Sequence, residues 1–153
     1  MDIAKFVEQR AKWKSLNIQN YTFTYEVSDY MREPNSHQRN IKCKGYVVLN
    51  NAVGSVAFDN NSEYFIIPGR NNPREKKMYI TSVDDAFDNI LKDYLRLKRL
   101  KDERKIDYLD ASDIWYDREY FFLKEICYSK FPFSHSYDKK PVYFELKDFK
   151  ITE

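Results

Sequence analysis

The segment from Thr81 to Leu100 constrains the fold more than any other part of the sequence, because it has the pattern of a helix with one apolar side. Its apolar residues recur at steps of three and four, which matches a helix of about 3.6 residues per turn. They are Val83, Ala86, Phe87, Ile90, Leu91, Tyr94 and Leu97. Thr81 or Ser82 can cap the first turn. Such a helix needs an apolar surface to cover, so we expect a sheet beneath it.

Strand patterns surround this helix. Residues 21–28 (YTFTYEVS) alternate strictly between apolar and polar side chains, which is typical of a half-buried antiparallel strand. The other expected strands cover residues 41–49, 53–58, 63–67, 113–117, 120–128 and 142–151, with a further short segment at 106–109. A first helix is expected over residues 2–16, and loops over residues 30–40, 68–77 and 129–141.

The order of these elements predicts the fold class. A helix, four strands, a second helix and three strands indicate an α+β protein with an antiparallel sheet of about seven strands and the helices packed on one face. We find neither an internal repeat nor a linker, and the length matches one typical domain. The prediction is a single domain over residues 1–153.

The near balance of basic and acidic residues argues against nucleic acid as a partner. The chain has 26 basic and 24 acidic residues and a net charge of +2, so it exerts little long-range attraction on nucleic acid. In the basic stretch from Arg96 to Lys105, Asp102 and Glu103 follow Lys98 and Arg99 by four residues, a spacing that allows ion pairs on a helix. This favours a solvated helix end over a phosphate-binding patch. We therefore expect nucleic acid to be an unlikely partner.

The sequence has no apolar run near the roughly 20 residues of a transmembrane helix. The first residues, MDIAKFVEQR, lack the apolar core of a signal peptide. The expectation is a cytoplasmic protein if the chain is complete, and a protein of the cell envelope or a secreted one if it is a mature fragment.

Residues suited to catalysis, metal binding or cofactor binding do not cluster. The glycines Gly45, Gly54 and Gly69 are isolated, so neither a P-loop nor a dinucleotide fingerprint is present. Asp84, Asp85 and Asp88 are explained as capping and dipole-compensating residues. His37 and His135 lie in polar loops, and Cys43 and Cys127 are far apart without a Cys-x-x-Cys motif. We expect no catalytic residues, no metal and no cofactor. The sequence leaves two alternatives for Cys43 and Cys127: two buried free cysteines, or a disulfide between them.

The aromatic content is the strongest indication of function. The chain has 13 Tyr, 11 Phe and 2 Trp, and the last third is crowded with them. Because aromatic residues occupy alternate positions on both sides of the expected strands, some must lie on the face opposite the helices. An aromatic sheet face can anchor a protein partner or stack on bases or sugars. The candidate binding residues are Trp115, Tyr116, Asp117 and Tyr120, which combine aromatic and acidic groups.

Several short motifs carry a resemblance. They are Trp13, NYTFTYEVS (20–28), TSVDDAFDNI (81–90), WYDREYFFLKEI (115–126) and FELKDFK (144–150). Together they resemble an uncharacterised family of small bacterial domains, often found in exported proteins and lipoproteins. Phe121 and Leu123 stand where that family usually has Gly and Pro. The resemblance implies a bacterial source and an α+β fold, and it supplies no catalytic residue.

Three functions follow as hypotheses. The first is a non-catalytic domain that binds a protein partner through an aromatic sheet face. The second is an immunity or inhibitor protein that blocks a partner enzyme, which also needs no catalytic group. The third is a hydrolase-like enzyme with a pocket near the 129–141 loop, which would need His135 beside an acid.

Overall fold

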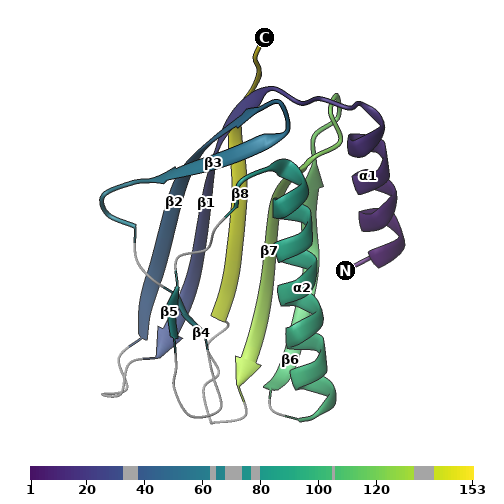
Figure 1. Ribbon diagram of the computed structural model, residues 1–153. Coiled ribbons are helices and arrows are strands. Elements are labelled where there is room, and N and C mark those ends of the chain that lie inside the picture. Colours follow the sequence, from purple (N-terminus) through teal and green to yellow (C-terminus); the bar gives the residue numbers. More distant parts are fainter. Residues whose placement is uncertain (33–37, 63–64, 68–73, 77–79, 105, 133–139) are drawn as a thin grey trace.

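The computed structural model describes residues 1–32, 38–62, 65–67, 74–76, 80–104, 106–132 and 140–153. Two helices and eight strands follow one another along these residues (Figure 1). They are α1 (Ile3–Ser15), β1 (Tyr21–Arg32), β2 (Gln38–Asn50), β3 (Val53–Phe58), β4 (Phe65–Ile67), β5 (Arg74–Lys76), α2 (Val83–Asp102), β6 (Ile106–Tyr116), β7 (Leu123–Pro132) and β8 (Lys140–Ile151).

The main sheet has six antiparallel strands in the order β3-β2-β1-β8-β7-β6, and β4 pairs with β5 in a separate two-stranded sheet. β1 and β8, from opposite ends of the chain, lie side by side at its centre. The α+β class and the antiparallel sheet are therefore confirmed, as are helices close to the predicted ranges 2–16 and 81–100.

The predicted strand number and order are wrong. Among the described residues, five strands rather than four lie between the helices, and the main sheet has six strands rather than about seven. The additional strand is β5, whose three residues (REK) are all charged and fall in the expected loop 68–77. A strand this short and without apolar alternation gives no periodic signal.

The expected segments 106–109 and 113–117 form one strand, β6, and β7 begins at Leu123 rather than at residue 120. Register shifts interrupt β6, which explains why its sequence does not alternate continuously. A turn organised by Asp117 occupies the residues before β7.

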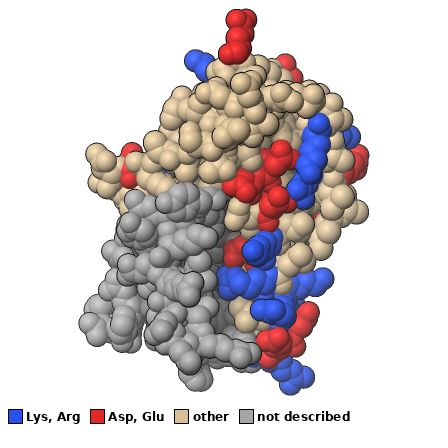
Figure 2. All heavy atoms as spheres, in the orientation of Figure 1, with Lys and Arg blue, Asp and Glu red and all other residues tan. Residues whose placement is uncertain are grey.

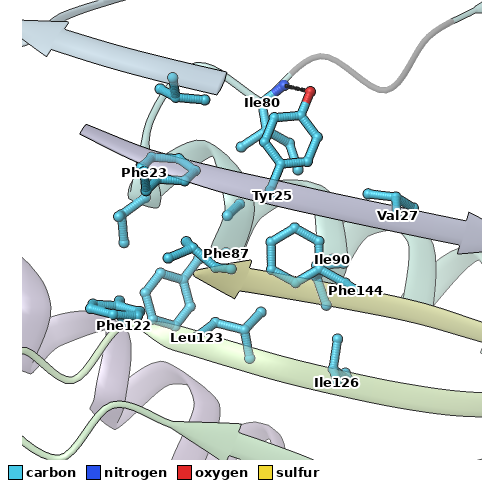
Figure 3. Close-up of a cluster of buried hydrophobic side chains, with 14 of the residues drawn as sticks. Phe23, Tyr25, Val27, Ile80, Phe87, Ile90, Phe122, Leu123, Ile126 and Phe144 are labelled. Carbon is cyan, nitrogen blue, oxygen red and sulfur yellow. Dashed lines mark hydrogen bonds between the residues drawn. The ribbon is translucent and has the colours of Figure 1, made fainter. Parts of the chain in front are cut away.

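The core lies between the helices and one face of the main sheet. Phe87 and Ile90 of α2 meet Tyr25, Phe144 and other buried side chains of the central strands (Figure 3). The helix α1 lies beside α2 (Figure 1): its Phe6 ring packs edge-on against Phe87 at 5.3 Å between centroids. The predicted apolar stripe of α2 thus faces the sheet.

The start of α2 is fixed by capping and by two tyrosines of β1. Ser82 caps the helix by accepting a hydrogen bond from the N–H of Asp85 at 2.9 Å. The hydroxyl of Tyr21 accepts from the N–H of Val83 at 2.9 Å, and that of Tyr25 accepts from the N–H of Ile80 at 3.4 Å (Figure 3). The bonds from Val83 and Asp85 occupy backbone donors that a helix start leaves unpaired, and the bond from Ile80 holds the segment that leads into the helix.

The hairpin of β2 and β3 curls toward the same point. A Cβ atom placed on Gly54 of β3 would lie 1.8 Å from the carbonyl oxygen of Thr81. Only a residue without a side chain permits this approach. The curled hairpin and the helix start therefore hold each other in place at one end of the sheet.

Candidate binding surface

The outer face is the side of the six-stranded sheet opposite α1 and α2, and β1 defines it. Every odd-numbered residue from Tyr21 to Val27 is buried beneath the helices. Every even-numbered residue from Thr22 to Ser28 is partly exposed on the opposite side. Such alternation follows from the two-residue period of a strand. It leaves one side of β1 available for contact from outside.

One row of side chains crosses the outer face from β2 to β6. Glu26 of β1 lies opposite Lys44 of β2 and Glu145 of β8. Glu145 lies opposite Glu125 of β7, which in turn lies opposite Trp115 of β6. Adjacent strands are about 4.8 Å apart, so the three carboxylates lie within about 10 Å across the sheet. We call Glu26, Glu145 and Glu125 the acidic row.

The acidic row places like charges directly opposite each other, which destabilises a sheet. Within the described part of the chain, its ion pair is between Glu145 Oε2 and Lys147 Nζ at 3.7 Å. The row therefore sets three carboxylates side by side on a face that also carries Lys44 opposite Glu26 and Lys147 beside Glu145.

Tyr143 of β8 holds part of the acidic row. Its hydroxyl donates to Glu145 Oε2 at 2.9 Å. Burial raises the pKa of Tyr143, and hydrogen bonding to Glu145 and Glu125 together with the negative charges of these two carboxylates raises this pKa further. The hydroxyl consequently stays protonated well above neutral pH and keeps donating. It orients Glu145 within the row.

A hollow of about 280 Å³ opens near the β2 end of this row. Its walls come from β1, β2, β3 and the residue after β3: Thr24, Lys44, Gly45, Tyr46, Ala57, Phe58 and Asp59. Tyr46 is 50% exposed at this place. The outer face thus carries an exposed aromatic ring near each end of the acidic row, Tyr46 on β2 and Trp115 on β6.

The structure places the first two predicted binding residues on opposite sides of β6. Trp115 is 62% exposed on the outer face. Tyr116 points to the helix side, where its ring centroid lies 6.5 Å from that of Phe6. Burial, and to a smaller extent the charge of Asp2, raises the pKa of Tyr116 to about 12. Trp115 and Tyr116 do not form one surface.

The other two predicted residues lie in the turn after β6. Asp117 Oδ1 accepts from the N–H groups of Glu119 at 2.9 Å and Tyr120 at 2.7 Å, which closes the turn. The ring of Tyr120 packs on Phe149 with 5.2 Å between centroids. Asp117 therefore stabilises the turn through these two hydrogen bonds, and Tyr120 packs at the edge of the core.

Sequence reasoning missed the acidic row. Glu26 lies on the polar side of the alternating segment 21–28, and Glu145 alternates with Phe144 and Leu146 in the last strand. These local patterns could have assigned each glutamate to the outer face. They could not have placed the glutamates opposite one another, because that depends on the pairing of strands that are distant in sequence.

Cys43 and Cys127 lie on opposite faces of the sheet, which rules out the disulfide left open above. Cys43 is buried opposite Val27, and Cys127 is half-buried on the outer face opposite Tyr143.

Among the described residues, no three His, Cys, Asp or Glu side chains are placed to hold a metal ion. His37, His135, Gly69 and residues 133–139 of the expected 129–141 loop lie outside the described residues.

The basic end of α2 matches the predicted solvated helix end. Arg96 pairs with Asp93 at 2.7 Å, and Arg99 lies 3.9 Å from Glu103. Figure 2 shows basic side chains gathered over the C-terminal half of this helix, on the side of the molecule that the helices cover.

Neither described helix is both long enough and apolar enough to cross a membrane. No family model matches this chain, and no curated protein matches it either.

Proposed function

We propose that this protein is a non-catalytic binding domain that recognises a protein partner through the outer face of its sheet. The observation that carries the proposal is the 62% exposure of Trp115 on a strand whose neighbouring residue, Tyr116, is packed inward. Tryptophan is enriched among residues that dominate binding energy at interfaces. An exposed tryptophan ring contributes little to the stability of the fold, because it stays in contact with water.

The shape of the outer face supports contact through side chains rather than through an added strand. The edge strands of the main sheet are β3 and β6. β3 has six residues, and the register of β6 shifts at three places. Short and irregular edges resist pairing with another strand. The face of the sheet offers Trp115, Tyr46 and the hollow beside Tyr46 to a partner.

The test is a selection of binders from a library of random linear peptides displayed on phage. We expect Trp115→Ala to fold as the wild type does and to lose the peptides that the wild type selects. Leu95→Ala is the matched control, because Leu95 is 45% exposed on α2, on the other side of the sheet. Peptides that bind Trp115→Ala as well as they bind Leu95→Ala would refute the proposed surface.

An inhibitor or immunity protein is the second candidate, and the acidic row favours it. Three carboxylates on adjacent strands match the positively charged active site of an enzyme that acts on phosphate-bearing substrates. The same face would then bind the enzyme. The two candidates differ in one outcome, because only an inhibitor abolishes the catalytic activity of its partner when the complex forms.

A further inference from the structure

We infer, on the basis of the proposed function, that the partner presents an arginine side chain to the outer face, where it pairs with Glu125 and stacks on Trp115. These two residues lie directly opposite each other on β7 and β6. Trp115 is 62% exposed, so the ring is accessible to a partner's side chain.

Charge complementarity selects a cation. The acidic row sets Glu26, Glu145 and Glu125 against one another across adjacent strands. Among the described residues, Lys147 pairs with one end of Glu145, and Lys44 lies opposite Glu26 at the far end of the row from Trp115. The repulsion within the row falls when a cation arrives beside Glu125, so the partner's positive charge interacts with more than one carboxylate.

Geometry selects arginine rather than lysine. A guanidinium group is planar, donates two parallel hydrogen bonds to a carboxylate and stacks on aromatic rings. Trp115 is the aromatic side chain that binds cations best, and Glu125 is its directly opposed neighbour. One guanidinium can contact both at a spacing of about 5 Å between the strands. An ammonium group can also approach the indole face, but it is not planar and cannot stack on the ring while donating two parallel hydrogen bonds to Glu125.

Tyr143 orients Glu145, the carboxylate next to Glu125 in the acidic row. Its hydroxyl donates to Glu145 Oε2, which also lies 3.7 Å from Lys147. Glu145 is therefore engaged from within the chain. Glu125 also interacts with this hydroxyl, and it lies between Glu145 and Trp115 across the sheet. It is therefore the carboxylate of the acidic row that lies next to the exposed indole.

The experiment analyses the composition of the peptides that bind in a Trp115-dependent manner. Arginine should be enriched in them. Replacing arginine by lysine in one selected peptide should raise its Kd by at least about threefold, and Glu125→Gln should raise the Kd by about tenfold. Glu119→Gln is the matched control, because Glu119 is an exposed carboxylate outside the row, and it should leave the Kd unchanged. Glu125→Gln should also unfold at no lower urea concentration than the wild type, which shows that its loss of binding is not loss of fold.

The outcomes separate the inference from the proposed function. Trp115-dependent peptides without enriched arginine would overturn the inference and leave the proposed surface standing. A selection with no Trp115-dependent peptide would overturn both. Binding of the polyamine spermidine with the affinity of the arginine peptide, unaffected by Trp115→Ala, would assign the acidic row to small polycations and overturn the inference.

Discussion

The hydroxyl of Tyr21 accepts a hydrogen bond from the N–H of Val83 at 2.9 Å, which joins the first residue of β1 to the first residue of α2. This bond fixes the helix over the sheet at the point where the helix begins. The side of the sheet that α2 covers, and hence the side left exposed, is set by contacts of this kind.

Tyr21→Phe should lower the free energy of unfolding by about 1–2 kcal/mol, because it leaves a buried N–H without an acceptor. Urea unfolding followed by circular dichroism measures the change. Tyr46→Phe is the control: Tyr46 is 50% exposed, so the change should stay within about 0.5 kcal/mol. Equal losses in the two variants would show that the bond to Val83 does not stabilise the helix start.

Stability should fall in alkaline solution. Burial raises the pKa of Tyr21 and of Tyr116 from 10.0 to about 12. The folded protein therefore keeps phenolic protons that the unfolded chain releases near pH 10. The stabilisation is fully present below pH 10 and is lost as the pH rises to about 12.

The measurement is the urea midpoint across this pH range for the wild type and for Tyr116→Phe. The variant has one fewer buried phenol, so its midpoint should decline less steeply with pH. A decline of the same slope would contradict the assigned burial of the Tyr116 hydroxyl.

Gly54→Ala should destabilise the fold by about 3 kcal/mol or more, because the added methyl group overlaps the backbone oxygen of Thr81 and the backbone cannot move away as a side chain can. Ser55→Ala, at the next and exposed position, should be close to neutral. Thermal melts of the two variants provide the comparison. A Gly54→Ala protein that melts with the wild type would show that the β2–β3 hairpin does not approach α2 this closely.

Phe121 has a φ of 64°, in the left-handed region that favours glycine. Phe121→Gly and Phe121→Ala both remove the ring, which lies 5.6 Å from the Lys12 ammonium. We expect the glycine variant to be the more stable of the two by about 1 kcal/mol. The same pair at exposed Lys124 should show the opposite order, because glycine weakens a strand. Urea unfolding of the four variants decides; a less stable glycine at residue 121 would contradict the turn geometry.

The fold class could be predicted because its signals are local. The stripe from Val83 to Leu97 and the alternation of residues 21–28 each lie within one element, so the period alone identifies a helix or a strand. The charged strand β5 had no such signal. Its formation depends on pairing with β4, which the sequence of three residues cannot reveal.

The candidate site was less predictable, because it depends on strand order. Placing β8 between β1 and β7 brings Glu145 between Glu26 and Glu125, and no local pattern specifies that order. The sidedness of Trp115 and Tyr116 was available from alternation, since neighbours in a strand point to opposite faces. The prediction treated Trp115 and Tyr116 as one surface with Asp117 and Tyr120 because all four lie in one short motif.

The most direct test of the binding surface is an NMR titration of nitrogen-15-labelled protein with a short arginine-containing peptide. Binding through the outer face should produce the largest shifts at the indole N–H of Trp115 and at the backbone N–H groups of Glu125 and Glu145, with little change along α2. Shifts that instead centre on exposed residues of α2, such as Leu95 and Lys98, while those of the outer face stay unchanged, would contradict it.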